Sequence, residues 1–228
     1  MPLLLIFLLA LLAAIIAPGL WVKRVMSKYS QPDDRYPGTG GELARHLLDN
    51  FGLQDVQAEI SEQGDHYDPE KRAVRLSEAN FNGRSLTAIT IAAHEVGHAH
   101  QHATGYKPLF WRTRLVRSAA MGEKAGAAIL MVAPAVLLLT RSPLAGALTF
   151  FGGFLVLGLG AAIHLVTLPV ELDASYGRAL PLLTKGDYLK PGDEPHARRL
   201  LRAAALTYVS ASLMSLLNVA RWWAILRR

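Results

Sequence analysis

Residues 85–103 read SLTAITIAAHEVGHAHQHA and carry the chain's candidate metal-binding motif. Its apolar side chains recur at helical spacing, which predicts a helix. Ser85 is a suitable N-cap because its hydroxyl can accept a hydrogen bond from a backbone N–H of the first turn. Gly105 and Pro108 follow the last periodic residue and predict the end of the helix. One helix therefore carries four histidines and a glutamate.

Two of these histidines, His94 and His98, are four residues apart in the segment HEVGH. On a helix this spacing places both imidazoles on one face, one turn apart, where both can bind one metal ion. Glu95 is rotated by about 100° from His94 and so stands beside the metal, where it can take a proton from an attacking water. The short motif is a weak signal alone, but the periodic helix around it and Gly97, which leaves space beside the metal, strengthen it. The alternative is a helix whose histidines only decorate a surface or join a buried network.

The third ligand of such a site has to come from outside the helix. Position 104, where an extended motif carries a third histidine, is Thr104, and the chain has no cysteine. A histidine or a carboxylate must therefore complete the site. The downstream candidates are Glu123, His164, Glu171 and Asp173.

Charge is distributed unevenly along the 228 residues. All 42 Asp, Glu, Lys and Arg residues lie outside four uncharged stretches, so that the remaining 144 residues are about 29% charged. The uncharged stretches are residues 2–22, 125–140, 142–170 and 203–220. Runs of this kind predict helices that cross a bilayer. They argue against an ordinary cytosolic globule, and the lack of cysteine excludes a disulfide scaffold.

We therefore expect a mainly α membrane protein with about four transmembrane helices and a small α+β zincin-like cytoplasmic domain that carries the HEXXH helix. The basic residues that follow residue 22 indicate a retained anchor with its N-terminus outside, rather than a signal peptide. Arg221 interrupts the last apolar segment, so an amphipathic surface helix is the alternative there. The expected parts are an anchor at 1–22, the zincin-like domain at 23–117, a transmembrane hairpin at 118–168, a third-ligand segment and cytoplasmic connection at 169–202, and a transmembrane or interfacial helix at 203–228.

Two short strands are expected before the HEXXH helix. Residues 56–60 and 74–76 alternate apolar and polar side chains, and Asp68-Pro69 has turn chemistry between them. Residues 74–77 could form an edge strand that pairs with an extended substrate, although packing alone would also explain them.

The net charge of +6 and the pI near 9.7 do not indicate nucleic-acid binding. Four of the surplus positive charges, Arg141, Arg221, Arg227 and Arg228, flank apolar segments. No stripe of basic and aromatic residues accompanies them. We expect a lipid bilayer and a peptide or protein substrate as partners, and no nucleic acid.

At this point the chain resembles a known family. The segments AAHEVGHAHQH and LPVELDAS, with a predicted hairpin between them, are similar to the YugP-type family of bacterial membrane zinc metallopeptidases, which are gluzincins. The upstream GDHYDPEKRAVRLSEANF and the downstream AAALTYVSASL resemble the same family. The resemblance implies a zinc endopeptidase of the bacterial inner membrane, while the predicted spans and their basic flanks predict a multi-pass topology with the active site facing the cytoplasm. The resemblance further implies that His94, His98 and Glu171 hold Zn²⁺ and that Glu95 is the general base.

One position departs from more distantly similar proteins. In the HtpX and prenyl-protein membrane proteases, an Asp four residues after the ligand Glu orients the first His. Here that position is Ser175, with Asp173 nearby, which leaves the orientation of the first His open.

A gluzincin also needs a donor for the oxyanion. Tyr208 is the first choice because a phenol in an apolar segment needs a polar partner. The other candidates are His66, Tyr67, Tyr176 and Arg178. The competing hypothesis from another class is a non-catalytic membrane adaptor with a structural zinc site, although such a site would not require Glu95.

Overall fold

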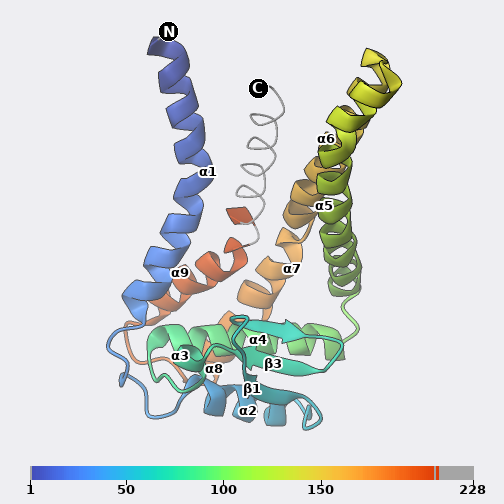
Figure 1. The fold of residues 1–228 in the computed structure, drawn as a ribbon. Coiled ribbons are helices and arrows are strands. Elements are labelled where there is room, and N and C mark those ends of the chain that lie inside the picture. The colour runs from blue at the N-terminus through green and yellow to red at the C-terminus, as the bar shows by residue number, and fades with distance from the viewer. Residues whose placement is uncertain (1, 208, 211–228) are drawn as a thin grey trace. The chain divides into compact units, whose positions relative to one another are not determined.

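The computed structural model describes residues 2–207, 209 and 210, and it gives only the backbone for some of their helical positions. This part of the chain is mostly helical, with one small sheet (Figure 1). Contacts divide the chain into two compact units. The first comprises Met1–Gly19, Trp111–Leu168 and Tyr208–Arg228, and the second comprises Leu20–Phe110 and Pro169–Thr207.

The second unit holds most of the short elements. Along the chain it contains the end of α1 (Pro2–Tyr29), α2 (Gly40–Asn50), β1 (Gln57–Ile60), β2 (His66–Asp68), β3 (Ala73–Leu76), α3 (Glu78–Phe81), α4 (Leu86–Ala103), the start of α5 (Lys107–Thr140), most of α7 (Leu168–Leu172), the π-helix η1 (Asp173–Ala179), α8 (Leu180–Lys185) and α9 (Glu194–Ala205).

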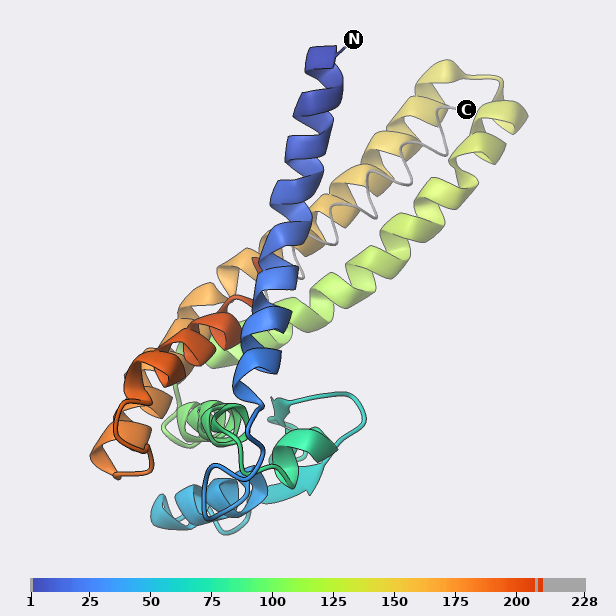
Figure 2. The same cartoon turned by 90° about the vertical axis from the view of Figure 1, so that its left-hand side faces the viewer.

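Helix α4 is the centre of this unit. It packs against α2 on one side and against η1 and α9 on the other (Figures 1 and 2). Nearly all of its residues are buried, including both faces of its first four turns. The expected boundaries are confirmed, because Ser85 Oγ accepts from Ala88 N at 3.1 Å and Gly105 has a φ of +64°. Burying a polar side chain in such a helix is unfavourable unless it has a hydrogen-bond partner, so the partners of the histidines and of Gln101 matter for the site below.

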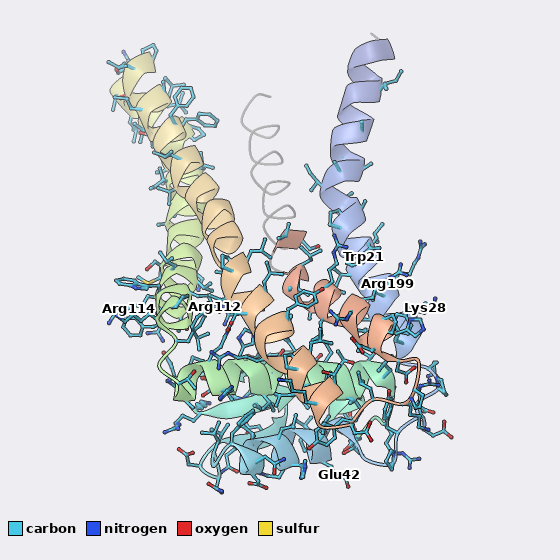
Figure 3. The ribbon with its side chains drawn as sticks, turned by 180° about the vertical axis from the view of Figure 1, so that it is seen from behind. Trp21, Lys28, Glu42, Arg112, Arg114 and Arg199 are labelled. Carbon is cyan, nitrogen blue, oxygen red and sulfur yellow. The ribbon has the colours of Figure 1, made fainter. Side chains whose placement is uncertain are left out.

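Helix α2 owes its position to a local motif. The side chain of Thr39 accepts from Glu42 N at 3.1 Å, while the carboxylate of Glu42 (labelled in Figure 3) accepts from Thr39 N at 2.8 Å. This capping box starts the helix. Its apolar stripe, which includes Leu43, Leu47 and Leu48, then packs into the core.

The sheet has the strand order β1-β3-β2. Strand β1 is parallel to β3, with Gln57 opposite Ala73, whereas β2 is antiparallel to it, with His66 opposite Arg75. The interpretation of residues 74–77 as an edge strand is wrong, since β3 is the central strand. Strand β2 was not predicted, because its three residues are too few to show an alternation of apolar and polar side chains.

The first unit contains a helical hairpin. The end of α5 and α6 (Pro143–Val166) are joined by Arg141 and Ser142. Glycines let the two helices approach, as small residues do at helix interfaces. A Cβ on Gly153 would lie 2.8 Å from Leu130 Cγ, and one on Gly146 would lie 3.0 Å from Leu137 Cβ.

The expected transmembrane architecture is wrong. Over the residues that can be described, the structure contains no helix that combines the length and the apolar character needed to cross a membrane. The prediction of about four transmembrane helices counted residues without charge. The multi-pass topology built on those spans is likewise unsupported, and the predicted segment 203–228 lies largely outside the described residues.

Candidate metal centre

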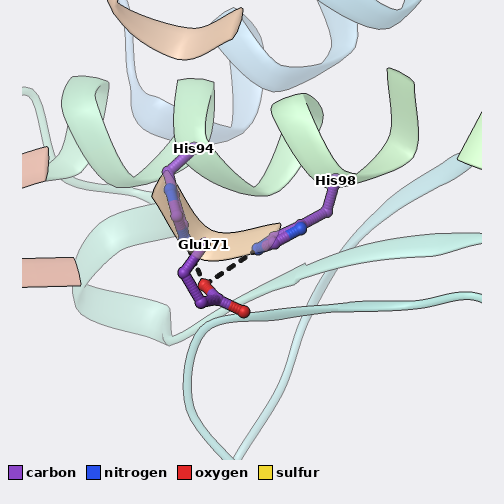
Figure 4. A group of neighbouring side chains, drawn as sticks. All are labelled: His94, His98 and Glu171. Atoms are coloured by element: carbon purple, nitrogen blue, oxygen red, sulfur yellow. Dashed lines mark hydrogen bonds and ion pairs between the residues drawn. The ribbon is translucent and has the colours of Figure 1, made fainter. Parts of the chain in front are cut away.

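Three side chains that sequence analysis had singled out converge in the second unit. His94 and His98 project from α4 toward Glu171 on α7 (Figure 4). Glu171 Oε2 lies 3.4 Å from His94 Nε2 and 3.2 Å from His98 Nε2. One nitrogen or oxygen from each residue lies within 4.8 Å of the others, and all three residues are buried, with exposed fractions of 1–3%.

The other ring nitrogen of His94 is held by Ser175. The hydroxyl of Ser175, on η1, lies 3.1 Å from His94 Nδ1 and 3.1 Å from the carbonyl oxygen of Leu201. A carbonyl can only accept, so Ser175 donates its hydrogen to Leu201 and accepts one from His94 Nδ1. His94 therefore carries its ring hydrogen on Nδ1 and directs the lone pair of Nε2 toward Glu171.

The other ring nitrogen of His98 is held by Gln101, one turn further along α4. Gln101 Oε1 lies 2.9 Å from His98 Nδ1, and Gln101 Nε2 donates to Val170 O at 2.9 Å and to Asp173 Oδ2 at 2.7 Å. The oxygen of the amide must accept, so His98 Nδ1 is again the donor. The Nε2 lone pair of His98 also faces Glu171.

Two nitrogen lone pairs and a carboxylate oxygen therefore meet in a buried space. Groups that can only accept repel one another unless a positive charge lies between them, and the low dielectric of the interior strengthens this repulsion. Two imidazole nitrogens and one carboxylate oxygen are a donor set typical of catalytic zinc sites, which leave a fourth position open. The residues present fit Zn²⁺.

Glu95 is next to His94 on α4 and is buried, with an exposed fraction of 6%. On a helix its side chain is rotated by about 100° from that of His94. Such a carboxylate can accept a proton beside the metal without belonging to the ligand set.

Asp173 is placed differently from Glu171. Its Oδ2 accepts from Gln101 Nε2 and, at 2.9 Å, from Arg178 Nε. Burial raises the pKa of Asp173, but these hydrogen bonds and the positive charge of Arg178 outweigh burial and lower the pKa overall. The charged carboxylate of Asp173 thus holds the amide of Gln101, which in turn contacts His98. The side chains of the other two candidates, Glu123 and His164, lie outside the described part of the chain.

The candidate oxyanion donors are mostly engaged elsewhere. Tyr67 Oη lies 2.8 Å from His102 Nδ1, and burial raises the pKa of Tyr67 to about 12. Tyr176 Oη donates to Arg198 O at 3.2 Å. Tyr208, the first choice, lies outside the described residues.

The remaining two candidates also have partners. His66 Nδ1 lies 3.0 Å from Gly64 O, and Arg178 Nη1 donates to His100 Nδ1 at 2.9 Å. Burial and the charge of Arg178 together lower the pKa of His100, with burial the larger cause.

Sequence reasoning missed Gln101. The signal was present, since Gln101 is three residues after His98 and therefore adjoins it on the helix surface. The role of Ser175 was left open because it stands where the resemblance would lead one to expect an Asp, and its contact with Leu201 O depends on tertiary packing.

Comparison with known proteins agrees with this chemistry. A family model described as "Putative neutral zinc metallopeptidase" matches residues 3–227. A protein of Bacillus subtilis (strain 168) named "Putative membrane protease YugP" is 40% identical over 206 residues, which make up 88% of this chain and 86% of that relative. The resemblance to the YugP-type family is thereby confirmed. No solved structure matches the chain.

Proposed function

This chain belongs to the neutral zinc metallopeptidase family, and from that premise we propose that it is a gluzincin-type endopeptidase that hydrolyses peptides or proteins. His94, His98 and Glu171 hold Zn²⁺, and Glu95 is the general base. The observation that carries the proposal is the convergence of both Nε2 atoms on Glu171 Oε2, with Glu95 beside them on the same helix.

Each residue has a distinct task. When bound, zinc polarises the scissile carbonyl and makes water acidic enough to lose a proton near neutral pH. Glu95 accepts that proton and later transfers it to the leaving amine. Ser175 and Gln101 hold the two imidazoles in the tautomer that presents Nε2. We retain Tyr208 as the proposed oxyanion donor, on the sequence argument alone.

We also propose that the chain acts at a lipid membrane. The relative from Bacillus subtilis is named a membrane protease. The first unit exposes large apolar side chains, which favour contact with lipid. These are Met121, Met131, Val132, Leu137, Leu138, Leu139, Leu144, Leu148, Phe151 and Leu155. Recovery of the full-length protein entirely in the supernatant after cells are broken and membranes are sedimented would contradict this proposal.

The variant Glu95→Gln tests catalysis. It keeps the shape of the side chain and the three proposed ligands but removes the proton acceptor, so zinc content should stay at that of the wild type. Hydrolysis of an unfolded test protein should fall by about 10²- to 10⁴-fold. Glu78→Gln is the matched control, because Glu78 is exposed on α3 and should not matter.

Three outcomes are informative. Equal cleavage by Glu95→Gln and wild type would mean that Glu95 is not the base. Zinc without cleavage in either protein would favour the structural adaptor. Wild type without zinc would overturn the assignment of the metal site.

A further inference from the structure

Gln101 is a polar side chain whose amide nitrogen and oxygen both have partners near the metal centre. It is fully buried on α4, with an exposed fraction of 0%, and its amide makes three hydrogen bonds. Burying an amide without partners is unfavourable, because the group loses its hydrogen bonds to water. Such a residue persists in a core only where its partners satisfy it, and here all three belong to the ligand-bearing segments or flank them.

The partners determine which end of the amide faces the metal centre. Val170 O and Asp173 Oδ2 both accept, so the NH₂ group must point toward them and the oxygen toward His98. If the amide were turned over, its oxygen would meet two other acceptors. The flipped state is therefore disfavoured on both bonds, and the tautomer of His98 follows from the arrangement on α7 and η1.

Asp173 is the anchor of this arrangement. Its carboxylate is charged, and Arg178 Nε donates to it at 2.9 Å, which keeps it in place. A charged acceptor makes a stronger hydrogen bond than a neutral one. Asp173 is two residues after Glu171, and its hydrogen bond to Gln101 connects it to the hydrogen bond between Gln101 and His98.

From these contacts we infer that Gln101 is a positioning residue of the metal centre. Its carbonyl oxygen sets the ring orientation and the tautomer of His98, and Asp173 acts on the metal through the Gln101 amide. The inference rests on the proposed function in one respect, that His98 binds zinc. It adds a task for two side chains that do not touch the metal.

A purely structural tether is the competing explanation. The NH₂ group of Gln101 links α4 to α7 through Val170 O, and this bond alone could account for the burial of the amide. The two explanations differ in the atom that matters. Positioning requires the oxygen that faces His98, whereas a tether requires the NH₂ that faces Val170.

The test uses full-length protein and two probes, Zn²⁺ affinity measured by competition with a chelator and the visible absorption of the Co²⁺-loaded protein. Gln101→Met removes both halves of the amide at similar volume and should weaken zinc binding by about 10- to 100-fold. The double variant Gln101→Glu with Asp173→Asn restores an acceptor for His98 and a hydrogen bond at position 173, but it leaves no donor for Val170. It should recover most of the lost affinity and the wild-type cobalt spectrum.

A second comparison tests whether Asp173 acts through Gln101. Asp173→Ala should weaken zinc binding in the wild-type background and should add little in the Gln101→Met background, because residues that act in series are not additive. Glu194→Ala removes a carboxylate from an exposed ion pair with Arg198 and serves as the control, which should leave zinc affinity unchanged. The unfolding free energy of each metal-free variant identifies any that does not fold.

Each outcome decides one question. Wild-type zinc affinity and cobalt spectrum in Gln101→Met would overturn the inference. Failure of the double variant to recover affinity would support the tether instead. Equal losses from Asp173→Ala in both backgrounds would show that Asp173 acts independently. If the wild type binds zinc but cleaves nothing, the proposed function fails while this inference still stands or falls on the metal measurements.

Discussion

At the scale of single residues, the candidate site depends on which ring nitrogen of each histidine carries the hydrogen. Each imidazole has two ring nitrogens, and the neighbour of one decides what the other can do. Ser175 and Gln101 are chemically unlike, yet both accept a hydrogen from Nδ1. A hydroxyl can thereby serve as the acceptor for His94. It can do so because Leu201 O takes the hydroxyl hydrogen and leaves the oxygen to accept.

Without zinc, the Glu171 carboxylate and the two Nε2 lone pairs repel one another, which lowers the stability of the folded protein. Glu171→Gln replaces a carboxylate that faces two lone pairs with an amide that can donate to His98 Nε2. The variant should lose zinc, yet its metal-free form should be more stable than metal-free wild type by about 1 kcal/mol, the value of one added hydrogen bond. Denaturant unfolding in excess chelator measures this difference. Exposed Glu78→Gln should change neither property, and a less stable metal-free Glu171→Gln would refute the argument.

At the scale of elements, the contact between α4 and η1 brings the ligands and their supports together. Gly97 allows this approach, because a Cβ there would lie 2.8 Å from Ala174 O. We expected Gly97 to leave space beside the metal. In the structure its missing side chain instead makes room for the backbone of η1. The π-helix then places Ser175 against His94, and Asp173 against Gln101, which contacts His98.

Gly97→Ala should therefore damage the site without touching a ligand. The added methyl group would have to displace the backbone of η1, at a cost of about 1–3 kcal/mol in the free energy of unfolding, and zinc affinity should fall with it. Thermal unfolding and chelator competition measure the two effects. Gly152→Ala in α6 is the matched control, since a Cβ there meets nothing within 4 Å. Wild-type zinc affinity in Gly97→Ala would show that this contact does not set the ligand geometry.

At the scale of the molecule, the second unit is assembled from segments far apart in the chain. Asp193, at the start of α9, accepts from Arg35 Nη2 at 2.6 Å and from Tyr36 Oη at 2.5 Å. The two partners precede it by more than 150 residues. Burial raises the pKa of Asp193, but the hydrogen bonds and the charge of Arg35 outweigh it and lower the pKa below the ordinary value of 3.8.

A lowered carboxyl pKa makes a definite prediction about acid stability. The folded state favours the charged form of Asp193, so its contribution is complete above pH 3.8 and is lost as the pH falls through the lower folded pKa. Asp193→Asn should be less stable than wild type at pH 7, and the difference should shrink as the pH falls below about 4. Urea unfolding of both proteins between pH 7 and pH 3 measures it. A difference that stays constant with pH would exclude the charge of Asp193 as the cause.

The sequence determined the features that depend on neighbours along the chain. The boundaries of α4 and the shared face of His94 and His98 follow from helix geometry and local capping. The resemblance to the YugP-type family could likewise be recognised from segments of the sequence, and the family match confirms it.

Only the tertiary structure decided which distant side chains meet. Glu171 and Asp173 are two residues apart and chemically similar, yet packing brings one to the imidazoles and the other to Gln101. Strand β3 became central because three residues with no readable pattern paired with it. The assignments of ligands, base and oxyanion donor remain predictions for experiment. Contacts such as that of Ser175 with His94, 81 residues apart, depend on how buried surfaces fit together, and no local pattern in the chain encodes that fit.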